Sequence, residues 1–193
     1  MMTMKRLRSD DGFTLSELVA ALGLLGIILA ATWAGFQASH NYSRLSDRQG
    51  WFAREVSAPL LQIERVLQQQ YRIDSTYPGV TAYRIKCETD ADNDGNREVW
   101  EITATADHRL VISNSEIRQD GSYERAQISY AWSTHNYNVQ TSTPLFRFYD
   151  KAGNLITNMG DVPSKAIRAV VTVVTVYDGK QFSDSKTILF RNY

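Results

Sequence analysis

The sequence contains few of the residues from which several classes of protein build their sites. Cys87 is the only cysteine among 193 residues, which excludes an intrachain disulfide and a multi-cysteine metal site. We therefore predict that Cys87 is a small buried hydrophobic residue. An excess of one charge is also missing, because 21 basic residues balance 21 acidic ones. The whole chain thus has no electrostatic bias toward nucleic acid or an anionic surface.

Catalytic motifs are missing as well. The three histidines are scattered, and the sequence has no Gly-x-Ser-x-Gly elbow, no His-Glu-x-x-His helix and no phosphate-binding glycine loop. Tyr130 and Trp132 belong to a group of aromatics that could stack on single-stranded DNA, but few cations lie near them in the sequence. We interpret them as core and edge-strand residues, and we predict that the protein is not an enzyme.

A long uncharged segment follows a basic N-terminus. Residues 18–36 contain no charged side chain, and Lys5, Arg6 and Arg8 precede them. The segment is longer than the 7 to 15 apolar residues of a secretory signal, so we expect it to be retained as a membrane helix over residues 13–38. The positive-inside rule then places the N-terminus in the cytoplasm and the rest of the chain outside.

Glu17 lies just inside this apolar segment. An ionised carboxylate costs about 2.5–3.5 kcal/mol at the centre of a membrane helix and less near its boundary, so Glu17 is expected to have a partner. If the chain were cut between Gly12 and Phe13, the new amino group of Phe13 would provide a nearby cation. That pairing would neutralise both groups.

Residues 12–19, with the basic residues before them and the apolar run after them, resemble the class III signal of type IV pilins and type II secretion pseudopilins. The resemblance implies a cytoplasmic leader over residues 1–12, which a prepilin peptidase removes after Gly12 before it methylates Phe13. It also implies that Glu17 guides the subunit into a filament of other pilins or pseudopilins. The expected location is the bacterial inner membrane and then an extracytoplasmic filament, with nucleic acid as a partner only if that filament takes up DNA.

Helical periodicity continues beyond the apolar segment. Apolar residues recur at spacings of three and four on an otherwise charged segment, namely Phe52, Val56, Leu60, Ile63, Leu67 and Tyr71. We predict an amphipathic half of the helix over residues 39–74 that extends past residue 70 and bends at Pro59, which lacks an N–H group.

The remaining residues, 75–193, alternate with a period of two and predict a β-rich domain. Residues 83–87, 100–104, 110–112, 126–132, 145–149, 166–177 and 188–190 are the expected strands. The valine-rich segment 166–177 is predicted to be central and covered on both faces. Turn residues at Gly121-Ser122, Gly153-Asn154 and Asp178-Gly179 favour antiparallel hairpins. The expected fold is α+β and pilin-like, with one meander-like sheet on the amphipathic half of the helix.

Three further stretches resemble the subgroup of pilin W-like minor pilins and the J-type minor pseudopilin of type II secretion. They are residues 89–100, 148–154 and 188–192. The resemblance implies a structural minor subunit assembled at or near the tip of a type IV pilus or a secretion pseudopilus. The alternative is a membrane-anchored extracytoplasmic binding module or enzyme whose anchor is not cleaved.

The acidic stretch Asp90 to Glu101 matches the pattern of an EF-hand calcium loop. Glu101 is expected on a strand, roughly 20 Å along the chain from Asp94 and out of reach of the same ion. Possible calcium ligands are Asp90, Asp92, Asp94, the carbonyl of Asn96, and Glu98. The competing interpretation is a solvated hairpin loop that uses Asp, Asn and Gly for its turn conformations.

Overall fold

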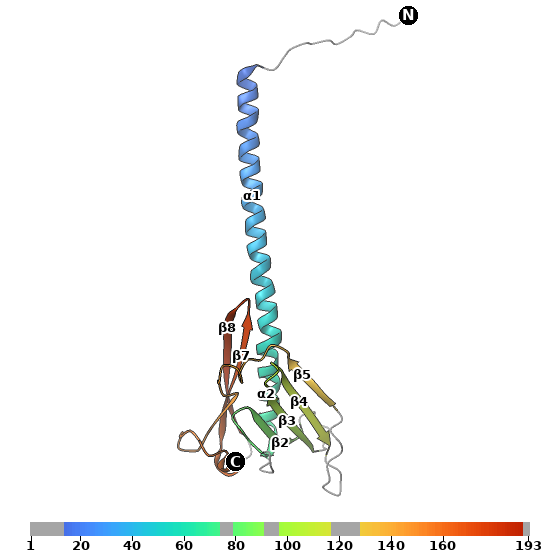
Figure 1. The fold of residues 1–193 in the computed structure, drawn as a ribbon, viewed down its shortest axis with the longest axis vertical. Helices are drawn as coiled ribbons and strands as arrows, with labels where there is room; N and C mark the ends of the chain where they lie inside the picture. Colours follow the sequence, from blue (N-terminus) through green and yellow to red (C-terminus); the bar gives the residue numbers. More distant parts are fainter. Residues whose placement is uncertain (1–13, 74–78, 91–96, 117–127, 191–193) are drawn as a thin grey trace, which may run out of the picture. The chain divides into compact units, whose positions relative to one another are not determined.

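The computed structural model describes residues 14–73, 79–90, 97–116 and 128–190 (Figure 1). The chain divides into two compact units, residues 1–47 and residues 48–193, and each is described by itself. The first unit holds most of helix α1, which spans Leu15–Phe52. The second holds the end of that helix, a π-helical turn at Ala53–Ser57, helix α2 at Ala58–Gln68, and every strand of the described residues.

Helix α1 has no buried residue. Its apolar side chains are exposed over residues 15–36, with Leu15 79% and Trp33 64% exposed. A helix that is apolar on all sides requires an apolar surrounding, and this one is long and apolar enough to cross a membrane. The predicted membrane helix is therefore present as a helix of suitable length and composition.

A π-helical turn stands where we expected Pro59 to bend the helix. Pro59 is in the first turn of α2, and in a regular α-helix its ring would crowd the carbonyl group of Glu55. In the structure, the N–H group of Ala58 donates to the carbonyl of Ala53, five residues earlier. The wider turn accommodates the proline without ending the helix, as single π-helical turns do elsewhere.

The helix ends earlier than its periodicity predicted. Helix α2 stops at Gln68, and Gln70–Ile73 forms strand β1, so the predicted extension past residue 70 is wrong. Gln70 pairs with Thr89 of strand β2 (Arg84–Thr89), and Ile73 pairs with Cys87. Tertiary strand pairing overrides the helical spacing here and leaves Tyr71 48% exposed rather than on the buried stripe.

Two antiparallel sheets replace the single sheet that we expected. The first is a meander in chain order, β1-β2-β3-β4-β5, which continues with β3 (Glu98–Ala104), β4 (Leu110–Glu116) and β5 (Ile128–Ser133). The second has the order β6-β7-β8, formed by Phe146–Tyr149, Arg168–Tyr177 and Lys180–Leu189. A short 3₁₀ turn, Met159–Asp161, and helix α3, Val162–Lys165, lie between β6 and β7.

Strand β7 is central in its sheet, as predicted, but only one of its faces is fully covered. Val171 and Val173 are buried, whereas Val170 and Thr172 are half-buried. On the second face Val174 is also buried, where Tyr137 and Asn138 bond to its backbone, so the predicted cover on both faces holds only near this residue. Asp178 and Gly179 join β7 to β8 with φ angles of 51° and 70°. Two such residues form the type I′ turn that favours a tight hairpin.

Helix α2 packs against strands of both sheets, including β2, β5, β7 and β8. Its residues Leu60, Ile63 and Leu67 are almost fully buried in the core. The core continues through the inward-facing residues of the strands, among them Ile85, Ile102, Ile112, Phe146, Phe148 and Val171. The apolar stripe of α2 thus packs against both sheets and belongs to a core that they share.

Cys87 lies in this core with none of its surface exposed, which confirms the prediction of a buried residue. Burial, together with the negative charge of Glu88, raises the pKa of its thiol to about 12. We expect Cys87 in the folded full-length chain to resist a thiol-reactive dye and to react fully after denaturation, because the thiolate is the reactive form. An Ala131→Cys chain, with the new thiol on an exposed strand position, should bind one dye per folded chain. Rapid labelling of folded wild type would contradict the prediction.

Candidate functional site: the helix start and the Glu55 cluster

The first turn of α1 is closed by reciprocal hydrogen bonds between Thr14 and Glu17. The N–H and hydroxyl groups of Thr14 each donate to Oε2 of Glu17, both at 2.9 Å. In return, the N–H group of Glu17 donates to the Thr14 hydroxyl oxygen at 3.3 Å. This arrangement is a capping box, which satisfies N–H groups that have no partner within the helix.

The capping box gives Glu17 a partner that the sequence interpretation did not include. A carboxylate in the first turn also interacts favourably with the positive end of the helix dipole. The signal was present in the sequence, because Thr14-x-x-Glu17 directly before an apolar run is the pattern of a capping box. Gly12 and Phe13 lie outside the described residues, so the pairing of Glu17 with the amine of Phe13 remains a prediction.

Two of the five predicted calcium ligands are described, and three are not. Asp92, Asp94 and Asn96 lie outside the described residues, while Asp90 follows β2 and Glu98 begins β3. Glu98 is buried, and its Oε2 accepts a hydrogen bond of 2.6 Å from the indole of Trp100. Within the described ranges no group of three or more His, Cys, Asp or Glu side chains could hold a metal ion. Calcium binding by this loop therefore stays a prediction.

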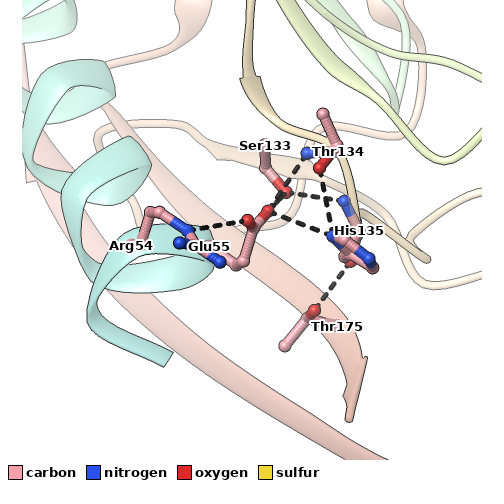
Figure 2. Close-up of polar contacts among 6 residues, drawn as sticks. All are labelled: Arg54, Glu55, Ser133, Thr134, His135 and Thr175. Carbon is pink, nitrogen blue, oxygen red and sulfur yellow. Dashed lines mark hydrogen bonds and ion pairs between the residues drawn. The ribbon is translucent and has the colours of Figure 1, made fainter. Parts of the chain in front are cut away.

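The π-helical turn places one carboxylate inside the domain. Glu55 is 4% exposed, although it belongs to the charged residues of the segment that carries the apolar stripe. Its Oε2 accepts hydrogen bonds from the hydroxyl of Ser133 at 2.8 Å and from the N–H group of Thr134 at 3.0 Å (Figure 2). Its other oxygen, Oε1, accepts from Nε of Arg54 at 3.2 Å. The carboxylate thus connects the helix to the end of β5.

His135 completes this Glu55 cluster, which consists of Arg54, Glu55, Ser133, Thr134 and His135. Its Nδ1 lies 3.7 Å from Oε2 of Glu55. Burial alone would raise the pKa of Glu55, but the bonds from Ser133, Thr134 and Arg54, with the charge of protonated His135, lower it below its ordinary value. The ionised form of Glu55 is therefore the form that the folded domain stabilises.

The backbone carbonyl of His135 also accepts a hydrogen bond from the hydroxyl of Thr175 on β7, at 2.7 Å (Figure 2). The side chain of His135 contacts the ring of Trp51 edge-on, with centroids 5.7 Å apart. Trp51 in turn lies 4.9 Å from the ring of Tyr177 at the end of β7. The segment after β5 thereby contacts the helix and both sheets.

Ser133, His135 and Glu55 are the residue types of a hydrolytic triad, but their hydrogen bonds connect them in a different order. In a triad the serine hydroxyl bonds to the imidazole, which bonds to the carboxylate. Here the Ser133 hydroxyl donates directly to Glu55, accepts from the backbone N–H of His135 at 3.2 Å, and is 2% exposed. The hydroxyl is neither activated by the imidazole nor accessible to a substrate, so the cluster acts as a structural tie.

Comparison with known proteins addresses the first segment of the chain. Residues 7–33 match the prokaryotic N-terminal methylation motif. The match contains Gly12, Phe13 and Glu17 and supports the type IV pilin-like family in general. It implies processing by a prepilin peptidase and assembly into filaments, which are structural rather than enzymatic roles, and it agrees with a single-pass inner-membrane protein. No curated protein and no solved structure matches the chain.

We expect Glu55→Gln to destabilise the domain at neutral pH by about 1.5–3 kcal/mol, the value of hydrogen bonds to a charged group. The lowered pKa of Glu55 makes this contribution present above the ordinary pKa and lost as the pH falls through the folded-state pKa. Chemical denaturation at several pH values should therefore show the difference between wild type and variant shrinking below pH about 4.

Glu64→Gln provides the matched control, because Glu64 lies on the same helix and pairs with Lys186 at a partly exposed position. Its loss should cost less than about 1 kcal/mol. If Glu55→Gln cost no more than Glu64→Gln at neutral pH, Glu55 would not be the tie described here.

Proposed function

We propose that this protein is a non-enzymatic minor pilin or pseudopilin that is cut after Gly12, methylated on Phe13 and assembled at or near the tip of a filament. The filament is a type IV pilus or a type II secretion pseudopilus. The observation that carries the proposal is the methylation motif on residues 7–33, which coincides with a helix that exposes its apolar side chains. A helix of this kind can move from lipid into the packed centre of a filament, because both surroundings are apolar.

Glu17 is the proposed assembly residue. Both hydrogen bonds from Thr14 end on Oε2, so Oε1 is not used by the capping box. The box also fixes the rotamer of the carboxylate beside the position where cleavage creates the amine of Phe13. We infer that this amine, from the same subunit or a neighbour, pairs with the carboxylate and lowers the cost of placing it in an apolar filament core.

The proposal of a minor subunit rests on different evidence from the proposal that the chain is pilin-like in general. The resemblance of residues 89–100, 148–154 and 188–192 to minor pilins and the J-type pseudopilin supports it. The α+β domain, with its helix packed on antiparallel sheets, suits a subunit that displays a folded head outside the membrane. The competing proposal is a membrane-anchored extracytoplasmic module that keeps residues 1–12.

Intact-mass analysis separates these two proposals. The pilin proposal requires a mature chain that begins at Phe13 and is heavier by one methyl group. The chain should be isolated from a host with active prepilin peptidase, and a Gly12→Val chain should serve as the uncleaved reference. A wild-type chain that still carries residues 1–12 would favour the uncleaved anchor.

Two substitutions separate the charge of Glu17 from its capping role. Glu17→Gln removes the charge, but a glutamine can still close a capping box. Thr14→Ala removes the hydroxyl and keeps the charge. We expect both chains to insert and to be cleaved, and only Glu17→Gln to fail to enter filaments, as measured by the amount of subunit in sheared filament fractions.

Normal incorporation of Glu17→Gln would reject the pairing with the Phe13 amine. If Thr14→Ala failed as completely as Glu17→Gln, the cap rather than the charge would be the assembly requirement. Glu17→Ala, which removes both features, provides the reference for complete loss.

A further inference from the structure

Strand β5 forms one edge of the five-stranded sheet (Figure 1). Within the described residues its backbone pairs with β4 and with no other strand. Ser129, Tyr130 and Ala131 are exposed in the middle of the strand. One row of backbone N–H and C=O groups is therefore open to pairing with another extended chain.

The edge of β5 differs in charge from the other sheet edges of the domain. Edge strands are usually protected from pairing by charged residues. Strand β1 contains Arg72, β6 contains Arg147, and β8 contains three charged residues, Lys180, Asp184 and Lys186. The sequence of β5, Ile-Ser-Tyr-Ala-Trp-Ser, has no charge and no proline. Its one irregularity is the register shift near its end, which leaves Ile128 to Ala131 regularly paired.

An aromatic groove borders this edge. It is lined by Ala58, Pro59 and Gln62 of α2 and by Trp100, Tyr130 and Trp132 of the sheet. The ring of Trp132 lies 6.4 Å from that of Trp100 and 6.3 Å from that of Tyr130. The indole N–H of Trp100 is already bonded to Glu98. The groove thus offers ring faces to an apolar side chain of an added strand.

We propose that the occupant of this edge is β5 of a second copy of the chain, paired antiparallel about a two-fold axis. A two-fold axis places each residue of the edge near the same segment of the other copy. A charge on the axis would then face its own copy, and a charge next to the axis would lie close to its own copy, which disfavours strand pairing. An uncharged edge on a chain of zero net charge is the composition that permits self-pairing.

The pairing would extend the five-stranded sheet continuously across both copies and cover the exposed face of Tyr130. Because six residues form a short strand pair, the dimer is expected to be weak and concentration-dependent. A covalent trap is therefore the suitable measurement. This interface involves neither the leader nor Glu17, so its test is independent of the proposed assembly into filaments.

Cysteine crosslinking tests the pairing in the full chain purified in detergent. Cys87 is buried, so we expect it to form no intermolecular disulfide in the folded chain. Facing residues of paired strands have Cα atoms about 4.5–5.5 Å apart, which is within the range of a disulfide. If the axis passes by Ala131, Ala131→Cys crosslinks to itself. If it passes by Tyr130, Ala131→Cys crosslinks to Ser129→Cys in a mixture of the two chains.

Ser183→Cys is the matched control, because Ser183 is an exposed serine on the charged edge strand β8. We expect disulfide-linked dimers from one of the two β5 combinations and not from Ser183→Cys. A lysine added to the same edge, as Ser129→Lys in the Ala131→Cys chain or Ala131→Lys in the Ser129→Cys chain, should reduce the crosslinked fraction about five-fold. Unchanged thermal midpoints would show that these chains remain folded.

Three results would overturn the proposal. The first is the absence of dimers in both registers from folded chains. The second is equal crosslinking of the β5 and Ser183→Cys chains, which would indicate contact through another part of the molecule. The third is crosslinking in cells to a different protein with none between copies, which would assign the edge to another partner.

Discussion

The bonds that Glu55 accepts from Ser133 and Thr134 hold the domain's helix to its first sheet. Their strength follows from burial, because a hydrogen bond to a charge is stronger where water is excluded. The same burial makes the bonds necessary, since a carboxylate 4% exposed without donors would be costly. Once Ser133 and Thr134 are fixed, the next residue reaches Thr175 of the second sheet, so one carboxylate helps to organise both layers.

Pro59 connects the π-helical turn with the hydrogen bonds of Glu55, because Pro59 lies four residues after Glu55. A regular helix through this region would crowd the proline ring against the carbonyl of Glu55. The wider turn relieves that contact and changes the direction of the side chains before it. Glu55 then lies inside the domain next to the neighbouring residue Val56, and both are buried.

The sequence allowed prediction of those elements whose stabilising contacts are local. The uncharged run before residue 37, the alternation of Ile85 with Cys87 and the turn at Asp178-Gly179 each encode their structure within a few residues. The division into two sheets could not be predicted, because strand order depends on contacts between distant segments. The end of the helix was misplaced for the same reason: Tyr71 continues the apolar spacing, but pairing of Gln70 and Ile73 with β2 decides its conformation. The burial of Glu55 could not be predicted, because its partners Ser133 and Thr134 lie about eighty residues away in the sequence.

The carboxylates of Glu17 and Glu55 differ in how far along the chain their hydrogen-bond donors lie. Glu17 accepts its hydrogen bonds from Thr14, three residues away, so these bonds require no folded domain and could form before and after the proposed cleavage. Glu55 is satisfied by residues that are brought to it only when the sheets have formed. The proposed move of α1 from lipid to filament would therefore leave the cap of Glu17 intact, while the hydrogen bonds of Glu55 would keep the domain folded independently of that move. This separation would allow the apolar helix to make the proposed exchange of surroundings at little cost to the stability of the domain.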